Sequence, residues 1–250
     1  MIDRDILLVV PCFNEENRFN SNYFKELLNH SNLRILFVND GSTDQTQYVI
    51  ENFVDISEGK ASLLNLPRNI GKANAVRGGF LSAFNSNFSR IGFLDADGAF
   101  PSEIVLGALH LIGTENFNLN SLWFSRVKLA GSKIERNWMR HYVGRIIATI
   151  ATYGIPNCPY DTQAGFKLFV NDEDTKKIWE KPFTTKWLFD IEIILRLDEL
   201  NLSDAIREIP VQAWRDVKGS KINAMTAISI LIEMLKILKL KRSYLKDHTR

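Results

Sequence analysis

Cysteine is scarce in this chain. Its 250 residues include only Cys12 and Cys158, whose number and spacing fit neither a disulfide framework nor a zinc site. We therefore expect both thiols to be reduced, as is usual in the cytoplasm. The chain also lacks internal repeats and low-complexity segments.

Long hydrophobic runs are absent as well. The longest uncharged stretch, 146–160, has 15 residues and is interrupted by Gly154, Pro156 and Pro159, so it is too short to span a membrane. The charged first residues lead directly into an apolar run, and we expect no signal peptide there. These features predict a cytoplasmic protein, either free or peripheral at the inner face of the membrane.

Glycine is missing before Gly41, which excludes the Gly-rich turn that a dinucleotide-binding domain places directly after its first strand. The first apolar run, 6–10, is followed instead by Pro11-Cys12-Phe13-Asn14-Glu15. Acidic and amide groups in this loop suit a base or ribose better than a diphosphate. The same absence argues against a sugar-nucleotide pyrophosphorylase, which should carry a Gly-rich phosphate loop here.

Net charge is also small, at +2, and the composition of 45% hydrophobic and 24% charged residues is that of an ordinary globular protein. Basic residues gather in two blocks, 126–145 and 218–250. Neither block contains regularly interleaved aromatic residues, and the N-terminal half is not basic. We therefore expect no nucleic-acid partner.

Carboxylates follow the predicted strands at the points where these strands end. The runs 6–10, 33–38 and 90–94 are continuous and apolar, which is typical of parallel strands covered on both faces. Because they alternate with helical segments, they predict an α/β fold with a doubly wound, mostly parallel sheet flanked by helices. The carboxyl ends of such strands share one edge of the sheet, where ligands bind.

Asp95 and Asp97 are the central pair at this edge. Their spacing places both side chains on one face of an extended segment, where two carboxylates suit Mg²⁺ or Mn²⁺. A surface turn is the alternative for this segment alone, since Asp-Gly is common in turns. Together with Glu15 and Asp40 after the preceding strands, however, the pair indicates a site.

Several local expectations concern helix starts in the first half. Ser21 is the candidate N-cap of a helix near 23–28, and Ser42 and Thr43 are candidate caps of a helix that continues to residue 53. Capping leaves Asp40 without a structural role. Gly71 and Lys72, at the start of another helix, offer backbone N–H groups and a cation to a phosphate or carbonyl group.

The second half is expected to contain further strands and helices. We predict strands over 121–127, 165–169 and 206–214, and helices over 135–153, 187–197 and 222–240. Asp190 and Glu192 fall in the apolar helix 187–197, where they need partners because unpaired buried charge is costly. The last helix carries an apolar face made of Ile222, Met225, Ile228, Ile232, Leu235 and Leu238.

Four segments resemble, in order, the motif set of family 2 glycosyltransferases with the GT-A fold. They are 10–15 (VPCFNE), 38–44 (VNDGSTD), 69–73 (NIGKA) and 95–97 (DAD). Later segments resemble dolichyl-phosphate β-glucosyltransferases and prokaryotic polyprenyl-phosphate glycosyltransferases. These are Ser125-Arg126, 161–169, 187–192 and the segment from Trp214 to Lys221. The resemblance covers roughly residues 5–225.

The resemblance implies an inverting, metal-dependent hexosyltransferase with Mg²⁺ or Mn²⁺ as cofactor. The donor would be a nucleotide sugar, with UDP and glucose favoured, and the acceptor a polyprenyl phosphate. Asp95 and Asp97 would hold the metal, and Asp40 would hydrogen-bond the uracil ring. The implied nucleotide-binding residues are Pro11, Asn14, Glu15, Asp40, Lys72 and Asp95.

A phosphate acceptor is already ionised and needs cations rather than a strong base. Arg126, Arg136 and Arg140 could supply that charge, and Gln163 and Lys221 could complete the acceptor side. In the alternative interpretation, these arginines are solvated helix residues and do not bind the acceptor. A sugar hydroxyl, as in cell-envelope polysaccharide synthesis, would instead require Asp190 or Asp161 as base. The expected catalytic residues are Asp97, Asp190 and Arg126. A non-catalytic nucleotide-binding scaffold would not need these groups together.

We expect one glycosyltransferase domain over 1–221, with a nucleotide-binding half at 1–115 and an acceptor half at 116–221. The tail, 222–250, combines its apolar face with a basic cluster. It could lie on an anionic membrane surface, pack on the domain, or pair with a second copy of the chain. The cluster consists of Lys236, Lys239, Lys241, Arg242 and Lys246.

Overall fold

A computed structural model of the chain describes residues 5–114, 120–135, 145, 148–150, 152–153, 155, 157–217 and 224–248. The expectations for Arg136, Arg140 and Lys221 lie outside the described residues. Most of the helix predicted over 135–153 lies outside them as well.

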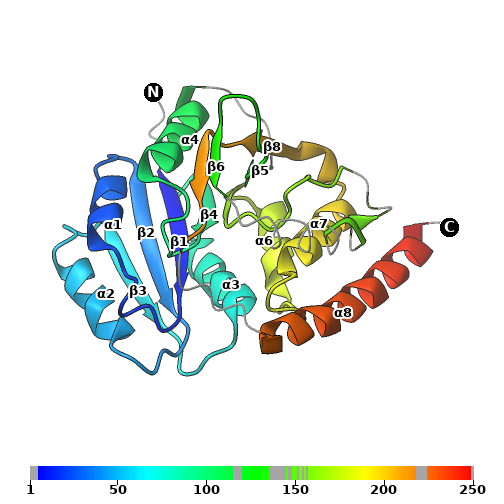
Figure 1. Cartoon of the computed structure of the whole chain (residues 1–250), viewed down its shortest axis with the longest axis horizontal. Coiled ribbons are helices and arrows are strands. Elements are labelled where there is room, and N and C mark those ends of the chain that lie inside the picture. Colours follow the sequence, from blue (N-terminus) through cyan, green and yellow to red (C-terminus); the bar gives the residue numbers. More distant parts are fainter. Residues whose placement is uncertain are drawn as a thin grey trace.

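A seven-stranded sheet runs through the middle of the molecule, in the order β3-β2-β1-β4-β7-β5-β8, with helices on both faces (Figure 1). Strand β7 is antiparallel to both of its neighbours, and all other pairs are parallel. The predicted α/β fold with a mostly parallel sheet is therefore confirmed. The strands are β1 (Ile6–Cys12), β2 (Leu33–Asn39), β3 (Ala61–Asn65), β4 (Arg90–Leu94), β5 (Ser121–Ser125), β7 (Phe166–Val170) and β8 (Ile206–Pro210).

The continuous apolar run in β1 feeds two hydrophobic cores, one on each face of the sheet. Ile6, Leu8 and Val10 pack into the core under α1, α2 and α4, whereas Leu7 and Val9 pack into the core under α3, α6 and α7. This alternation follows from the pleat of a strand covered on both faces. The helices are α1 (Ser21–Leu28), α2 (Thr46–Asp55), α3 (Lys72–Ala83), α4 (Ser102–Thr114), α6 (Glu173–Glu180), α7 (Phe189–Glu199) and α8 (Ala224–His248), with a 3₁₀ turn at Ser203–Ala205.

Two elements of the second half differ from the sequence-based expectation. The single strand predicted over 206–214 is wrong, because the chain leaves the main sheet after β8 and forms β9 (Ala213–Arg215). Strand β9 pairs in parallel with β6 (Lys133–Glu135) in a separate two-stranded sheet. Glu135 therefore ends a strand rather than beginning a helix.

The N-termini of α1 and α2 also differ from the predicted ones. Asn20, not Ser21, caps α1, because its side chain accepts a hydrogen bond from the Tyr23 N–H at 3.1 Å. Helix α2 begins only at Thr46, so Ser42 and Thr43 do not cap it. The Ser42 hydroxyl instead accepts from the backbone N–H of Asn14 and ties the first two loops together.

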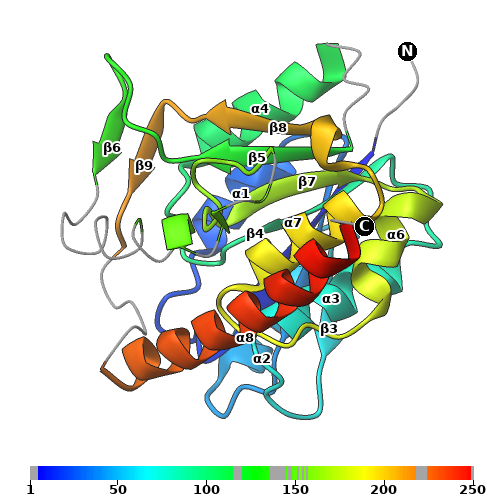
Figure 2. The same cartoon turned by 90° about the vertical axis from the view of Figure 1, so that its right-hand side faces the viewer.

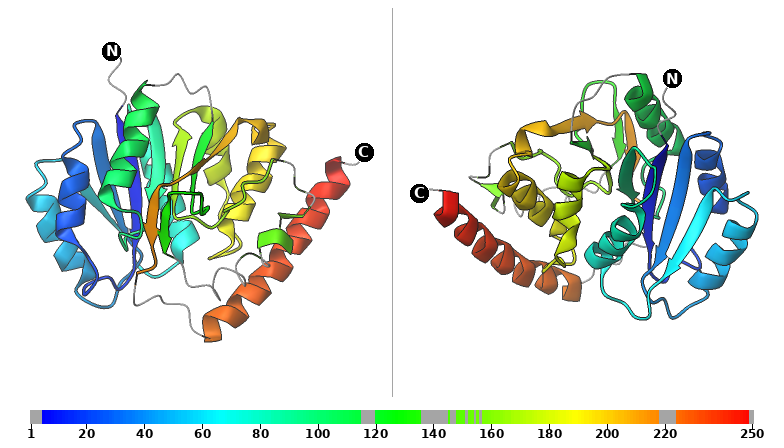
Figure 3. Two further views of the ribbon diagram at one scale, coloured as in Figure 1. Left: turned by 45° about the horizontal axis from the view of Figure 1, so that its top comes forward. Right: turned by 180° about the vertical axis from the view of Figure 1, so that it is seen from behind.

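Helix α8 lies on the outer side of α7, at the opposite side of the molecule from β3 (Figures 2 and 3). Its inward side includes Glu233, Met234, Ile237 and Lys241, which are buried. Of the predicted apolar face, Ile232, Leu235 and Leu238 are exposed and therefore do not pack onto the domain. The expectations for Ile222 and for the side chains of Met225 and Ile228 lie outside what the structure describes. Within the described residues, no helix is both long and apolar enough to cross a membrane.

Candidate active site

A cavity of about 610 Å³ opens at the carboxyl ends of β1, β2 and β4. The structure brings most of the expected site residues together there, although they come from distant parts of the chain. Its lining includes Pro11, Glu15, Asp40, Lys72, Asp95, Asp97, Arg126, Gln163 and Asp190. Asn14 is placed beside this cavity, outside its lining, where its side chain accepts a hydrogen bond from the Thr43 N–H at 2.9 Å.

The two carboxylates after β4 lie in this cavity beside a lysine from the start of α3. The ammonium group of Lys72 is 2.5 Å from Asp95 Oδ1. Burial alone would lower the pKa of Lys72, but the charges of Asp95 and Asp190 outweigh burial and raise it. Burial, followed by the negative charge of Asp95, raises the pKa of Asp97 above that of an ordinary carboxyl. A cation bound between the two carboxylates would relieve this repulsion.

Gly165 leaves the space that the Asp95 carboxylate occupies. Its carbonyl oxygen accepts from the Asp95 N–H at 2.9 Å, which joins the end of β4 to the start of β7. A Cβ at position 165 would lie 2.0 Å from Asp95 Oδ2, far inside van der Waals contact. Only glycine therefore permits the observed position of this carboxylate.

Asp40 has a structural role that the sequence did not reveal. Its carboxylate accepts hydrogen bonds from the N–H groups of Ile70 at 2.7 Å and Gly71 at 2.9 Å. The expectation that the Gly71 N–H is available to a phosphate is therefore wrong, because Asp40 already binds it. Burial raises the pKa of Asp40, and these two bonds oppose that rise.

Asp190, at the start of α7, finds its partner in Lys167 of β7. The Lys167 ammonium group is fully buried and lies 2.7 Å from Asp190 Oδ1. It also donates to the carbonyl oxygen of Ala164 at 2.6 Å and lies 4.4 Å from the Trp123 ring centroid. Burial raises the pKa of Asp190 and lowers that of Lys167, while their mutual attraction opposes both shifts.

Arg126 forms a bidentate pair with Asp161. Its Nε and Nη2 atoms each donate to Asp161 at 2.7 Å, and its backbone N–H donates to the same carboxylate at 2.9 Å. The guanidinium group also lies over Trp214, 5.2 Å from the ring centroid. Arg126 is thus fixed in place at the cavity wall by β5, the 161–165 loop and β9.

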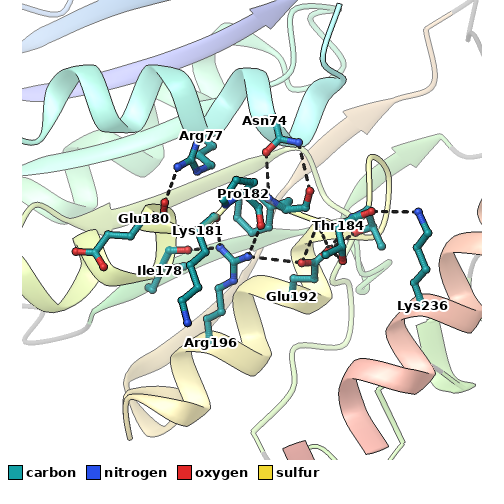
Figure 4. A network of polar contacts seen from close by, with 12 residues as sticks. Asn74, Arg77, Ile178, Glu180, Lys181, Pro182, Thr184, Glu192, Arg196 and Lys236 are labelled. Atoms are coloured by element: carbon teal, nitrogen blue, oxygen red, sulfur yellow. Dashed lines mark hydrogen bonds and ion pairs between the residues drawn. The ribbon is translucent and has the colours of Figure 1, made fainter. Parts of the chain in front are cut away.

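A loop between α6 and α7 forms another part of the wall, and polar side chains hold it from three helices. Asn74 of α3 exchanges two hydrogen bonds with the backbone of Phe183, and Arg196 of α7 donates to three carbonyl groups between 178 and 182 (Figure 4). Glu192, expected to need partners, accepts from the backbone and hydroxyl groups of Thr184 and Thr185.

Glu233 of α8 completes this support. Its carboxylate accepts from the N–H groups of Lys186 and Trp187, both at 2.9 Å, and of Leu188 at 3.1 Å. All three of these loop residues line the cavity, as does Ile230 of α8 itself. The first half of α8 is therefore joined directly to the site.

Some cavity residues were not identified from the sequence as site residues. Arg18, Phe100 and Lys186 line the cavity but stand outside any motif that pointed to chemistry. Lys167 does not line the cavity but binds Asp190, which does. It could have been found, because a lysine in an otherwise apolar strand needs a buried partner for the same reason that Asp190 does. The sequence gives no comparable signal for Arg18, Phe100 and Lys186.

The donor set fits a divalent cation that also binds a substrate diphosphate. Among the described residues, no group of three or more His, Cys, Asp or Glu side chains forms a closed metal cage. Asp95 and Asp97 offer two carboxylates in an open cavity, and Mg²⁺ or Mn²⁺ commonly takes one or two carboxylates plus phosphate oxygens and water. These two residues would hold such an ion.

Comparison with known proteins agrees with this geometry. The model of the family "Glycosyl transferase family 2" matches residues 7–174. A dolichyl-phosphate beta-glucosyltransferase of Trichomonas vaginalis is 30% identical over 240 residues, covering 92% of this chain and 72% of that protein. The Saccharomyces cerevisiae protein of the same name is 32% identical over 244 residues, covering 88% of this chain and 70% of the relative.

Solved structures share the fold. Glucosyl-3-phosphoglycerate synthase from Mycobacterium tuberculosis in complex with UDP aligns with a TM-score of 0.65 at 17% identity, over 94% of this chain and 80% of that one. The same enzyme with Mn²⁺, UDP-glucose and phosphoglyceric acid aligns with a TM-score of 0.65 at 18% identity, over 94% and 79%. At such identity the likeness establishes the fold alone, whereas the family match covers most of the chain. The chain is therefore a glycosyltransferase that belongs to glycosyl transferase family 2.

Proposed function

We propose that this enzyme transfers glucose from UDP-glucose to a polyprenyl phosphate, with inversion at the anomeric carbon and with Mg²⁺ or Mn²⁺ held by Asp95 and Asp97. The observation that carries this proposal is the carboxylate pair beside Lys72, in a cavity at the carboxyl ends of the parallel strands. Relatives named dolichyl-phosphate beta-glucosyltransferase align over most of the chain and support the choice of donor sugar and acceptor.

On the donor side, Pro11, Glu15 and Asp40 would form the nucleoside end of the site. Each Asp40 oxygen accepts one backbone hydrogen bond and keeps a second lone pair, which could accept an N–H of uracil. A bound divalent ion would supply Lewis-acid stabilisation of the leaving diphosphate. Lys72, which is held beside Asp95, would add positive charge near the same diphosphate.

On the acceptor side, a phosphate oxygen would attack the anomeric carbon while the bond from that carbon to the UDP oxygen breaks. A phosphate monoester carries negative charge at neutral pH, so no side chain has to remove a proton. Arg126 would attract and orient the phosphate. The Gln163 Nε2 atom is buried and makes no hydrogen bond among the described residues, so it could donate to the same group.

The test compares Asp97→Asn with Asp174→Asn, a control that removes an exposed carboxylate of α6. Donor affinity is measured by calorimetry with UDP-glucose in Mn²⁺ and in EDTA, and turnover is measured with a short polyprenyl phosphate. Asp97→Asn should lower turnover by about 100-fold or more, the scale on which loss of one electrostatic contact to developing charge acts. The control should behave like the parent.

Equal donor affinity in Mn²⁺ and EDTA, together with unchanged turnover of Asp97→Asn, would contradict the metal assignment. Transfer only to a hydroxyl acceptor would retain the donor side of the proposal and refute its acceptor side.

A further inference from the structure

The outward face of α8 exposes a row of large apolar side chains. Leu231, Ile232 and Leu235 are 59%, 53% and 68% exposed, and Leu238 is 36% exposed. They recur at the spacing of adjacent helical turns, so they form one continuous strip along the helix. Contiguous apolar surface of this kind commonly marks an interaction site.

The orientation of α8 is fixed by its other face. Glu233 accepts three backbone N–H groups from the loop at 186–188, and Met234 and Ile237 are buried against the domain. Turning the apolar strip inward would break these three bonds and expose that core. The strip therefore lies on the outer surface of α8 in the folded protein. Figure 2 shows the helix itself in front of α7.

The charges on this surface are all of one sign. Lys239 and Arg242 are exposed, and Glu233 is the only acid between residues 229 and 242 and faces inward. Lys236 is also exposed, but its ammonium group donates to the Thr184 carbonyl at 3.4 Å, so it lies at the edge of this surface (Figure 4). A second copy packed on this face about a two-fold axis would bring the cations of both copies into one interface with no acid to pair them, which is unfavourable. An anionic lipid surface complements both the apolar strip and its cations.

The N-terminal end of the apolar strip lies next to the cavity. Ile230 lines the cavity, Leu231 follows it on the outer surface, and Glu233 holds the cavity loop. A surface that binds the strip would thus lie beside the mouth of the site. For an enzyme whose acceptor phosphate sits at a bilayer surface, this placement brings the acceptor close to the carboxylate pair.

We propose that the outward face of α8, comprising Leu231, Ile232, Leu235, Leu238, Lys239 and Arg242, binds the surface of an anionic lipid bilayer. The argument for its benefit to catalysis rests on the proposed lipid-phosphate acceptor. The binding itself depends only on the strip and its charges.

The experiment is flotation of the full-length protein with two kinds of vesicle. One contains phosphatidylcholine alone, and the other contains in addition about 30% phosphatidylglycerol, which gives the vesicle the negative surface of an anionic leaflet. The variant Leu235→Ser/Lys239→Glu changes the strip without touching any residue placed in the cavity. The matched control, Ile56→Ser/Lys25→Glu, makes the same changes at exposed positions near α1 and α2, at the far side of the molecule (Figure 3).

We expect the parent and the control to float with anionic vesicles at low salt and to stay unbound with phosphatidylcholine alone. The strip variant should lose about tenfold or more in partitioning, because one apolar anchor and one attractive charge are removed and a repulsive charge is added. Circular dichroism and thermal melting establish that each variant is folded.

Equal flotation of the strip variant and parent would overturn the proposal. So would absence of parent flotation, including the case in which light scattering shows a dimer that the strip variant dissociates. Turnover with UDP-glucose and a short, water-soluble polyprenyl phosphate separates the two proposals. Absence of this turnover in the parent would refute the acceptor assignment alone. If the parent turns over this substrate, the strip variant should do so at the same rate.

Discussion

Removing the Lys167 side chain should destabilise the fold strongly, because it would leave Asp190 buried without the cation that it binds directly. The Lys167 side chain has no exposed surface, and Asp190 is only 5% exposed. Substitution with Met keeps the apolar length of the side chain but deletes the ion pair at 2.7 Å and the bond to the Ala164 carbonyl at 2.6 Å.

Lys167→Met is expected to lower the free energy of unfolding by about 3–5 kcal/mol, the range observed when one partner of a buried ion pair is removed. For a chain of this size it corresponds to a fall in Tm of roughly 6–20 °C. Replacing both partners, as in Lys167→Met/Asp190→Leu, removes the isolated charge. The double variant should recover to within about 1–3 kcal/mol of the parent, the remainder being the unbonded Ala164 carbonyl.

Urea unfolding followed by tryptophan fluorescence measures both values, and Trp123 lies next to the pair. A double-mutant cycle with Asp190→Leu then gives the coupling between the two side chains. A Lys167→Met protein within 1 kcal/mol of the parent, a margin of about the size of an ordinary substitution, would refute the buried-pair account. A double variant as unstable as the sum of the single ones would refute it too.

Two further predictions follow from the geometry. Gly165→Ala should lower turnover sharply while leaving the protein folded, because the added Cβ would lie 2.0 Å from the present position of Asp95 Oδ2 and displace that carboxylate. The control is Gly107→Ala in α4, where a Cβ meets nothing within 4 Å, and it should leave turnover unchanged. Burial raises the pKa of the Cys158 thiol to about 11, so its contribution to stability is complete below the ordinary thiol pKa and is lost as pH rises through 11. Stability should fall by about 2–3 kcal/mol over this window in urea titrations at successive pH values. Cys158→Ala should remove that fall, and an identical pH dependence in the variant would contradict the assignment.

The sheet could be predicted from the sequence because its strands are buried on both faces. Residues 6–10, 33–38 and 90–94 are continuous apolar runs, and the structure places all of them in parallel neighbouring strands. The two-stranded sheet could not be predicted in the same way. The segment Lys133–Glu135 has only three residues and is mostly exposed, so neither its length nor its periodicity distinguishes a strand from the start of a helix.

The candidate active site, too, could be predicted from the sequence only in part. That carboxylates after successive strands would cluster followed from the geometry of parallel strands, and Asp40, Asp95 and Asp97 do line one cavity. The bond from Asp40 to Gly71 was missed because it joins residues 31 apart, and no local pattern encodes it. The direction of the apolar face of α8 stayed open in the sequence because Glu233 fixes it through the distant loop at 186–188.

The central claim is tested most directly by incubating the protein with UDP-glucose, Mn²⁺ and a short polyprenyl phosphate, beside the corresponding polyprenol that lacks the phosphate. Mass spectrometry identifies the product, and proton NMR of the anomeric position gives its configuration. The account predicts a β-linked glucosyl phosphodiester from the phosphate, no product from the alcohol, and no product in EDTA. Transfer to the alcohol alone, or an α-linked product, would contradict it.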